Sequence, residues 1–566
     1  MQNQNRFFEA RIMSALPKLF DKGRTRGIVT IIALALGQAA STGVAAFATR
    51  DVFAAFRDTE TGLPVAALAL VACSGLAIAA MRYRERVVAE RVGQDYVAAL
   101  RVKLFQHLAQ VSARDLARRR AGALSLRFVG DLSAVRNWVS LGLTRLTSSL
   151  IVLPLATLVL FLLNVHLAVA AAIPIAIGML AMAIAGPRLG PAHKKLRSRR
   201  ARLAADMSER VPHAPELRLL GRVKTETRHI IKRTETLIDA ALERARGAAL
   251  LRAIPDAVSG AAAASVFVTA LASGAAAAEA AGALAAVGLM IQPLRELAGV
   301  WDRHRAWKVA RDKCESLLSV PKLANRTDNE LSVLENVPQS LTFKSAGAGR
   351  LSPVNVIARP GKKIAIIGPN GSGKSTLLSL AAGLESPESG AVLLGDRNAF
   401  ELSTSERRKL IAYIGTRSPI LAGSLKRALT MGVDGVLDDD TIFRCAEEFG
   451  LGQVIERMGG LSGKVSEAGR NLSAGEIRRV LLTRAALSNS SLLLLDEPDD
   501  ALDQDGIRLV EQLVSNTPAT TLMITHNRDL AAQMDEIWII DDGRLTIKGP
   551  PELVFTDRSE AVRDWR

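Results

Sequence analysis

The sequence predicts two domains of different fold class: an all-α transmembrane domain of six spans with long cytoplasmic helical arms, followed by an α/β domain built around a phosphate-binding loop. Three observations support this division. The N-terminal half holds six apolar stretches long enough to cross a bilayer. A glycine-rich loop, GPNGSGKST, follows a short apolar run in the C-terminal half. The chain of 566 residues is also longer than one compact hydrophobic core usually accommodates.

The composition fits alanine- and leucine-rich spanning helices. Hydrophobic residues make up 49% of the chain, aromatic residues make up only 4%, and the mean hydropathy is +0.18. The fifth and sixth stretches have few large side chains, so hydropathy alone leaves a buried soluble helix open for both. The uneven spacing of the six stretches favours spans. We expect the spans at about Ile28–Ala48, Leu63–Met81, Leu143–Leu163, Leu167–Gly186, Ile254–Ala275 and Ala280–Val300.

Two long polar segments, Arg82–Gly142 and Pro187–Arg252, separate the second span from the third and the fourth from the fifth. Both carry apolar residues at helical spacing among dense charge, which is typical of packed helical arms. An arm of about 25 to 30 residues extends on the order of 40 Å if it is helical. We expect the tips of the arms near Ser112–Arg118 and Val211–Glu216. The alternative is a solvated coiled coil with no role in coupling.

The distribution of Lys and Arg predicts the orientation in the membrane. The long arms hold many of these residues, whereas the short links between spans hold only Arg50 and Arg57. Because basic segments stay on the cytoplasmic side, we place both arms, the N-terminus and the C-terminal domain there. The net charge of +17 would suggest nucleic acid in a soluble protein. Since these residues flank spans and no nucleic-acid module is visible, we attribute them to anionic lipid headgroups and expect no nucleic-acid partner.

The N-terminal residues are polar and basic, and no small-residue cleavage pattern follows the first apolar run, so we expect no removable signal. Six apolar residues at helical spacing predict instead an amphipathic helix on the cytoplasmic surface. They are Phe7, Phe8, Ile12, Met13, Leu16 and Phe20. The three cysteines, Cys73, Cys314 and Cys445, have no metal-binding spacing and indicate no disulfide framework.

The phosphate-binding loop follows the apolar run Ile364–Ile367 and precedes a helical stretch. Its glycines let successive backbone N–H groups converge on phosphate oxygens, and the helix adds its positive end. We expect Lys374 to reach the β and γ phosphates of ATP and Ser375 to hold Mg²⁺. The alternative is a merely tight strand-to-helix turn. The expected nucleotide-binding residues are Gly368, Pro369, Asn370, Gly371, Ser372, Gly373, Lys374, Ser375 and Thr376.

A second group of site residues follows the run SLLLL, which reads as a strand buried on both faces of a parallel sheet. Carboxylates at the C-terminal end of such a strand face the crevice where ligands bind. We expect Asp496 to complete the Mg²⁺ shell through water and Glu497 to polarise the attacking water. His526 follows the next apolar strand and is placed to sense or stabilise the γ-phosphate. A histidine taken alone is more often a surface or core residue.

The segment NLSAGE, at Asn471–Glu476, lies between the phosphate loop and the DEP motif at Asp496–Pro498, and it corresponds to the signature motif of a known family. Together with the phosphate loop, DEP and the later histidine, it resembles the ABC transporter family, and the six-span plan resembles its exporter-type half-transporters. In that family the signature caps ATP from the opposite subunit. Ser473 and Gly475 match the family's pattern, whereas Ala474 and Glu476 replace its second glycine and its glutamine. Asp503, in DALD, matches the aspartate of the family's D-loop.

The sequence departs from the family at two points. An aromatic residue that stacks on adenine is expected upstream of the phosphate loop, but that segment contains only Phe343, which lies too early. The glutamine of the family's Q-loop falls on Thr416, whose side chain is shorter. The resemblance therefore implies that hydrolysis survives, with weaker base stacking and altered coupling. A shifted alignment in loops of variable length is the alternative explanation for both gaps.

The resemblance implies a transmembrane domain at residues 1–320, a linker at 321–339 and an ABC nucleotide-binding domain at 340–566. Its cofactors would be ATP and Mg²⁺. The chain has one phosphate loop and one signature, so the resemblance implies a dimer, with a homodimer favoured over a heterodimer. The implied function is ATP-driven export or flipping of a substrate across a membrane, and a bacterial inner membrane is favoured over an organelle.

The predicted spans hold few charged side chains, which favours an apolar or amphipathic cargo over a small ion. Three other functions stay open. The chain could be the poorer-site subunit of a heterodimeric exporter, or a membrane-tethered ATPase that regulates a complex without moving cargo. Import is the third, and it is disfavoured because importer permeases of the common kinds are usually separate chains.

Overall fold

The computed structural model describes residues 16–56, 63–117, 119, 127–188, 190–323, 337–416 and 418–556. The chain divides into two compact units: residues 1–109 with 119–320, and residues 110–118 with 321–566. Most of the expected amphipathic helix at the N-terminus lies outside the described residues, as do Arg57, Arg118 and much of the expected linker.

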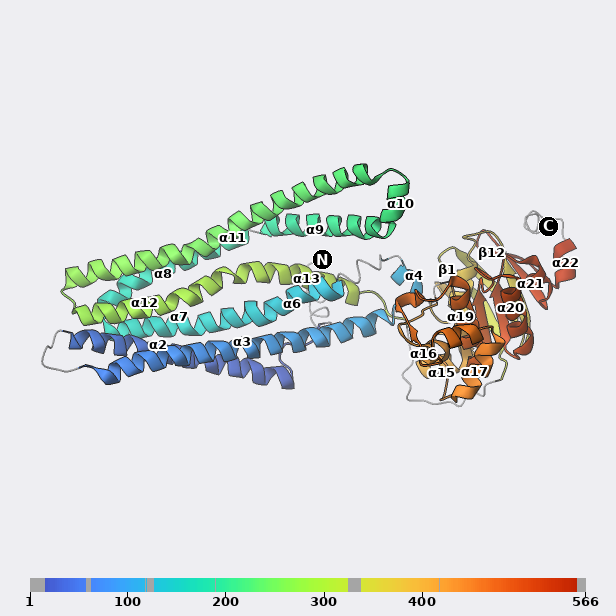
Figure 1. The fold of residues 1–566 in the computed structure, drawn as a ribbon, viewed down its shortest axis with the longest axis horizontal. Coiled ribbons are helices and arrows are strands. Elements are labelled where there is room, and N and C mark those ends of the chain that lie inside the picture. The colour runs from blue at the N-terminus through green and yellow to red at the C-terminus, as the bar shows by residue number, and fades with distance from the viewer. Residues whose placement is uncertain are drawn as a thin grey trace. The chain divides into compact units, whose positions relative to one another are not determined.

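The first unit contains six helices that are long and apolar enough to span a membrane, by length and composition, among the described residues. Each contains one expected span apart from at most two residues at an end, and Figure 1 shows them as long helices running side by side. The fifth ends at Ser273, two residues earlier than expected, because Gly274 leaves the helix with a φ of +65°. The six are α2 (Lys22–Ala55), α3 (Val65–Leu108), α7 (Thr144–Leu163), α8 (Val165–Arg188), α11 (Val223–Ser273) and α12 (Ala277–Ala298).

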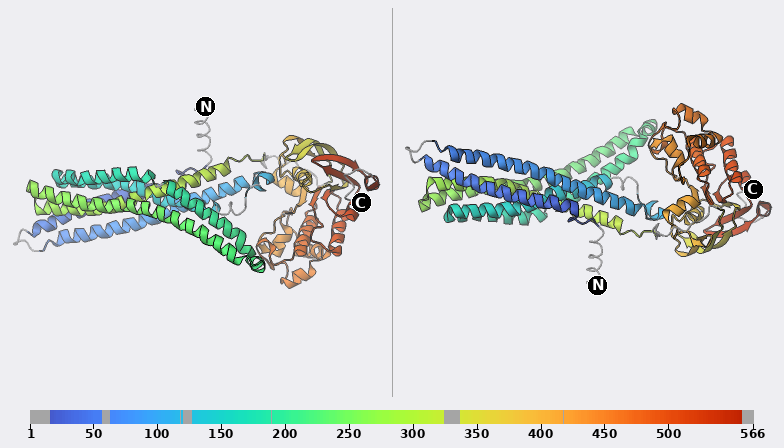
Figure 2. Two further views of the ribbon diagram at one scale, coloured as in Figure 1. Left: turned by 90° about the horizontal axis from the view of Figure 1, so that it is seen from above. Right: turned by 90° about the horizontal axis from the view of Figure 1, so that it is seen from below.

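Two of these helices extend well beyond a bilayer. α3 has 44 residues and α11 has 51, which correspond to about 66 and 77 Å at 1.5 Å per residue. A hydrocarbon core is about 30 Å thick, so both continue outside it as the expected arms. In both views of Figure 2 the arm that contains α11 diverges from the other helices of its unit.

The tip of that arm forms where the sequence places two prolines. α9 (Gly190–Arg210) leads into the 3₁₀ turn η3 (Val211–His213) and then α10 (Ala214–Leu219), which connects to α11. Pro212 and Pro215 each occupy the first turn of a short helix, where the missing N–H is tolerated. The expected tip near Val211–Glu216 therefore falls on η3 and α10.

The first unit also contains shorter elements that connect or extend the long helices. They are the π-helical turns η1 (Arg127–Asp131) and η2 (Trp138–Leu143), α6 (Leu132–Asn137) and α13 (Val300–Leu318). Close helix packing depends on small residues, as is usual in membranes. A Cβ added at Gly282 on α12 would lie 3.0 Å from the carbonyl oxygen of Ala46 on α2.

A buried polar cluster joins three spanning helices. Glu85 of α3 is only 2% exposed. Its carboxylate accepts a hydrogen bond of 2.5 Å from Gln38 Nε2 of α2 and one of 2.7 Å from Ser148 Oγ of α7. Among the described residues, no Lys, Arg or His forms an ion pair with it. Neutral donors alone therefore satisfy this carboxylate.

The second unit is an α/β domain built on a six-stranded sheet of order β12-β11-β3-β10-β9-β6. All neighbours in it are parallel except β11 and β12. A four-stranded antiparallel sheet, β2-β1-β4-β5, and a short β7-β8 pair complete it. The strands are β1 (Leu341–Ala348), β2 (Leu351–Ala358), β3 (Lys363–Ile367), β4 (Ser389–Leu394), β5 (Arg397–Asn398), β6 (Ile411–Ile414), β7 (Gly423–Ser424), β8 (Lys464–Val465), β9 (Leu492–Asp496), β10 (Thr520–Ile524), β11 (Glu536–Asp541) and β12 (Arg544–Gly549).

Helices cover this sheet, and hydrophobic cores lie on both of its faces. Every residue of β9 is buried, as its run of leucines predicts for a strand inside a parallel sheet. The second unit also includes α4 (Ala113–Ala117), which follows α3 in the chain. Its other helices are α14 (Lys374–Ala381), α15 (Thr404–Leu410), α16 (Leu425–Thr430), α17 (Asp439–Glu448), α18 (Gly452–Arg457), η4 (Glu467–Gly469), α19 (Ala474–Ser488), α20 (Gln504–Asn516), α21 (Arg528–Ala532) and α22 (Pro551–Thr556).

Candidate nucleotide-binding site

The phosphate loop connects β3 to α14, as the sequence predicts. Gly368, Gly371 and Gly373 have φ angles of +145°, +81° and +108°, which other residues rarely adopt. A Cβ at Gly368 would also clash with the carbonyl oxygen of Ile540. Such a turn directs backbone N–H groups toward one point at the positive end of a helix. It has the properties of an anion-binding cradle.

Lys374 is buried at the start of α14 and donates hydrogen bonds of 2.6 and 2.9 Å to the carbonyl oxygens of Gly368 and Pro369. Burial lowers the pKa of this lysine, and the nearby carboxylates of Glu497 and Asp496 oppose the shift. Ser372 adds a buried hydroxyl that has no hydrogen-bond partner among the described residues. Both groups suit the oxygens of a phosphate chain.

Ser375 and Asp496 meet at the edge of the sheet. The Ser375 hydroxyl donates to Asp496 Oδ1 over 3.2 Å, joining the first turn of α14 to the end of β9. Asp496 is 3% exposed, and burial raises the pKa of its carboxyl group. A hydroxyl and a carboxylate are oxygen donors of the kind that Mg²⁺ prefers. The pair therefore fits the expected metal ion.

Glu497 and His526 form a second pair, with His526 Nε2 lying 3.5 Å from Glu497 Oε1. Both side chains are partly exposed to solvent. The backbone of Glu497 has a φ of +53°, a costly conformation for this residue type, and its N–H donates to the carbonyl oxygen of Ile524 over 2.9 Å. Strain of this sort is common where a side chain is held for function.

Sequence reasoning missed Asp499, which lies beside that pair. Its Oδ2 accepts a hydrogen bond of 2.9 Å from Thr525, the residue before His526. Thr525 Oγ1 in turn accepts the N–H of Asn527 over 2.9 Å. Burial raises the pKa of Asp499, and the charges of His526 and Glu497 also act on it. An acidic residue two positions after the DE pair was the available signal.

The signature segment begins α19. Ser473 is its N-cap: the side chain accepts the N–H of Glu476 over 3.2 Å, and Glu476 Oε2 accepts the N–H of Ser473 over 2.9 Å. Glu476, which replaces the family's glutamine, also pairs with Arg457 through contacts of 2.9 and 3.0 Å. Among the described residues, no hydrogen bond or ion pair joins Ser473 or Gly475 to the phosphate loop.

Asp503 is likewise the N-cap of α20. Its side chain accepts the N–H of Gly506 over 2.8 Å and lies 3.4 Å from Arg479 of the signature helix. Among the described residues, Asp503 thus contacts α19 and forms no hydrogen bond or ion pair with the phosphate loop of the same chain.

A cavity of about 760 Å³ lies between α4 and the metal-site residues of the same unit. It is lined in part by Arg114, Ser375, Thr416 and Asp496. Thr416 is exposed, and its side chain makes no hydrogen bond to another described residue. Tyr413 also lines the cavity, and burial raises its pKa to about 12. Thr416, which the sequence analysis aligns with the family's glutamine, is thus one of the residues that line this cavity.

α4 is attached to the nucleotide-binding domain at the far end of α14. Ala113 N donates to the carbonyl oxygen of Leu384 over 3.0 Å. Arg114 Nε lies 2.8 Å from Glu385 Oε1, and Arg114 Nη2 lies 2.6 Å from Glu388 Oε1. Glu385 is 4% exposed, so this ion pair is largely removed from solvent. The expected tip near Ser112–Arg118 thus contacts the domain at a defined charge pair.

Phe343 is unavailable for stacking on a base. It is 1% exposed in β1 and packs edge-on against Trp538, with ring centroids 6.5 Å apart. The structure therefore places this residue in the hydrophobic core.

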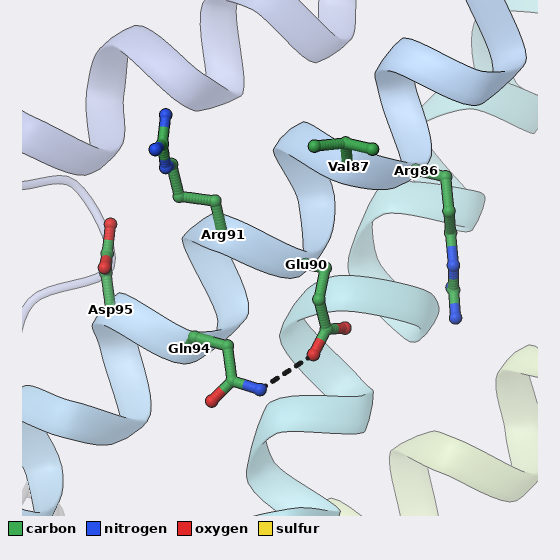
Figure 3. Close-up of a pocket in the computed structure, with 6 residues that line it drawn as sticks. All are labelled: Arg86, Val87, Glu90, Arg91, Gln94 and Asp95. Carbon is green, nitrogen blue, oxygen red and sulfur yellow. Dashed lines mark hydrogen bonds between the residues drawn. The ribbon is translucent and has the colours of Figure 1, made fainter.

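The first unit contains a separate recess of about 570 Å³ along α3. Figure 3 shows that its six residues all come from this helix, with Gln94 donating to Glu90 Oε1 over 2.9 Å. Two arginines and two carboxylates line it, so its charges balance. The chemistry of a nucleotide site is found only in the second unit, among the described residues.

Comparison with known proteins agrees with this division. The model of the ABC transporter transmembrane region matches residues 14–280, and the ABC transporter model matches residues 351–500. An uncharacterised ABC transporter ATP-binding protein of Haemophilus influenzae is 28% identical over 264 residues, covering 45% of this chain and 47% of its own length. The chain therefore spans about half the length of that relative.

Two further likenesses extend over nearly the whole chain. An ATP-dependent lipid A-core flippase of Desulfotalea psychrophila is 22% identical over 531 residues, covering 91% of this chain and 92% of that protein. The structure of a bacterial Atm1-family ABC exporter with ATP bound superposes with a TM-score of 0.84 at 20% identity, covering 96% and 98% of the two chains. At this identity the superposition shows a shared fold. With a transmembrane region and a nucleotide-binding domain in one polypeptide, the chain belongs to the ABC transporter family.

Proposed function

We propose that the chain is a half-transporter that dimerises and uses ATP hydrolysis to export or flip an apolar or amphipathic substrate. The observation that carries this is the division of the site. One edge of the sheet holds Lys374, Ser375, Asp496, Glu497 and His526. Among the described residues, no hydrogen bond or ion pair joins Ser473 or Gly475 to them.

Each residue has a role that its geometry supports. The loop N–H groups, Lys374 and Ser372 would bind the phosphates of ATP, and Ser375 with Asp496 would hold Mg²⁺. When bound, Mg²⁺ supplies positive charge that offsets charge on the phosphate oxygens. Glu497 accepts a proton from the attacking water, and His526, 3.5 Å from it, orients that water and the γ-phosphate.

The dimer follows from the signature. Ser473 presents the N-terminus of α19, where N–H groups and the helix dipole favour an anion. In our proposal this end caps ATP held by a second subunit, together with Gly475 and Asp503. A homodimer is the simplest assembly, because one chain then supplies both halves of each site.

Coupling to the membrane domain runs through α4. The P-loop helix α14 begins at Lys374 and ends beside Leu384 and Glu385, and these two residues hold α4. α4 is joined through four residues to the end of α3, a spanning helix. A shift of α14 on nucleotide binding would therefore reach α3 without the side chain at Thr416.

We infer the class of cargo from the low charge of the membrane-spanning helices. They carry few charges, and the buried carboxylate at Glu85 is satisfied by neutral donors instead of lining an ion path. One relative that matches most of the chain is described as a flippase of lipid A-core, an amphipathic lipid. We infer a similar class of cargo, a bacterial inner membrane as the location, and domain limits at residues 1–320 and 340–566.

A second candidate is the poorer-site subunit of a heterodimeric exporter. Two observations favour it: Phe343 is buried in the core, and Thr416, aligned with the family's glutamine, has a shorter side chain that makes no hydrogen bond to another described residue. Both would weaken nucleotide binding or coupling at one site of a pair.

The test uses the purified full-length protein reconstituted in vesicles with a fluorescent phosphatidylethanolamine as the probe. We expect a dimer by light scattering, ATP-dependent movement of the probe, and loss of movement in Glu497→Gln. A dimer that hydrolyses ATP without moving this or other amphipathic probes indicates a tethered regulatory ATPase. A monomer with negligible turnover indicates the heterodimer subunit.

A further inference from the structure

We propose that Arg350 binds the triphosphate of the nucleotide and so is a substrate-binding residue outside the phosphate loop. The inference rests on the proposed function, because it requires ATP at that loop. Arg350 lies in the turn between β1 and β2, and none of the motifs that identify the site includes it.

The turn lies directly over the phosphate loop. A Cβ added at Gly371 would be 3.3 Å from Arg350 Nη1. One added at Gly373 would be 3.3 Å from Cδ1 of the next residue, Leu351. Arg350 and the first residue of β2 thus face two glycines of the cradle, and the Arg350 guanidinium lies beside Gly371.

The backbone of the turn is fixed from its other side. Ser352 N donates to the carbonyl oxygen of Gly543 over 2.8 Å. Gly543 has a φ of +76°, and a Cβ there would clash with the carbonyl oxygen of Arg350. Across the turn, Ala348 pairs with Leu351 in the antiparallel ladder. Arg350 therefore extends from a rigid base.

The guanidinium is available for an anion. Arg350 is exposed, and no carboxylate among the described residues forms an ion pair with it. The other loop cation, Lys374, is already bound to two loop carbonyl oxygens. Arg keeps its charge at any physiological pH and presents a planar set of N–H donors that matches phosphate oxygens.

This contact would offset the missing adenine aromatic. With Phe343 in the core, base stacking contributes less to ATP binding than in relatives that have that aromatic. A charge-assisted bond to the phosphates strengthens binding from the opposite end of the nucleotide. The guanidinium lies beside Gly371, in the phosphate cradle, so the phosphate chain is the group within its reach.

The test measures ATP hydrolysis by the full-length protein in lipid nanodiscs, with inorganic tripolyphosphate, which lacks a base, as a competitor. In Arg350→Ala we expect the KM for ATP and the inhibition constant of tripolyphosphate each to rise about tenfold, with kcat changed less than about threefold. Arg350→Lys keeps the charge and should fall between wild type and alanine. Arg350→Gln keeps the aliphatic stem and loses the charge. It should therefore raise both constants as much as expected for alanine, and it tests the proposal if the alanine variant does not fold.

Arg359→Ala is the matched control, because it removes an exposed arginine beyond the far end of the same strand, β2. We expect it to leave both constants within about twofold of wild type. An increase in the KM for ATP without a change for tripolyphosphate would mean that Arg350 contacts the base, and the proposal would be wrong. Unchanged constants would also refute it. A wild-type protein that neither binds nor hydrolyses ATP would instead refute the proposed function.

Discussion

Arg114 of α4 and Glu385, which lies four residues past the end of α14, form an ion pair of 2.8 Å in which the carboxylate is almost completely buried. Glu388 binds the same guanidinium at 2.6 Å. Gly349, with a φ of +59°, makes room for it, since a Cβ there would lie 2.7 Å from Arg114 Nη1. This pair attaches the tip segment to the element that begins at Lys374.

The first prediction is that Arg114→Ala uncouples hydrolysis from transport. The variant removes the guanidinium from the buried carboxylate of Glu385 and so weakens the attachment of α4, which then keeps the backbone hydrogen bond from Ala113 to Leu384. We expect probe movement in vesicles to fall by about tenfold or more while ATP hydrolysis stays within about threefold of wild type. Both rates are measured on the same vesicles.

Arg408→Ala is the matched control for that variant. Arg408 lines the same cavity as Arg114, but its pair with Asp434 is exposed on both sides. We expect it to change neither rate by more than about twofold. Restored movement in the double variant Arg114→Glu with Glu385→Arg would support the charge pair. Normal movement in Arg114→Ala would exclude it as the route.

The second prediction concerns Asp499. Its hydrogen bond to Thr525 fixes the residue that precedes His526, so loss of that bond should misplace the histidine relative to Glu497. We expect Asp499→Ala to lower kcat for ATP hydrolysis by about tenfold with little change in KM. Asp499→Asn keeps an oxygen that can accept the bond and should recover most of the rate. A rise in the KM for ATP with kcat unchanged would contradict a positioning role.

The third prediction concerns the buried cluster at Glu85. Gln38→Leu leaves one oxygen of a buried carboxylate without a donor, which should lower the free energy of unfolding by about 1–3 kcal/mol. Thermal unfolding in detergent measures this. Thr42→Val is the control on the same helix, because the Thr42 hydroxyl bonds only to the carbonyl oxygen of Gln38. Equal losses in the two variants would show that the carboxylate is not the cause.

The spans and the phosphate loop could be predicted because each depends on residues close together in the chain. A spanning helix needs about twenty apolar residues in a row, and the loop needs glycines at fixed offsets between a strand and a helix. The run of leucines before Asp496 likewise predicts a buried strand, and all five residues of β9 are buried. Local patterns therefore predicted the two fold classes and the position of the phosphate loop between a strand and a helix.

The contacts between distant segments could not be predicted in the same way. Arg114 and Glu385 are far apart in the sequence, and each belongs to a charged segment in which many other pairs are equally plausible. Glu85 reads as one charge in the run RYRERVV, and its burial depends on α2 and α7 packing on either side. Arg350 lies in no motif, and its nearness to Gly371 depends on packing of the β1–β2 turn against the segments around Gly373 and Gly543.

The fourth prediction separates the two roles of the signature segment. Ser473 caps α19, and Glu476 both completes that capping box and pairs with Arg457. Glu476→Gln keeps the cap, because an amide oxygen can accept the N–H of Ser473, and it loses only the charge pair. Arg457 is 55% exposed on its side chain, so that pair contributes little to stability. We therefore expect unfolding and ATP hydrolysis to change little.

Ser473→Ala removes the cap itself and the hydroxyl that would face the nucleotide of the partner subunit. Loss of an N-cap costs about 1 kcal/mol, which is too small to abolish folding. If the signature acts across the dimer, this variant should lose most ATP hydrolysis. It should also lose most nucleotide-dependent dimer formation, measured by light scattering with vanadate. Its own phosphate loop should still bind ATP. A variant that hydrolyses ATP normally would mean that Ser473 serves only to begin the helix, because a cap alone affects stability and not turnover.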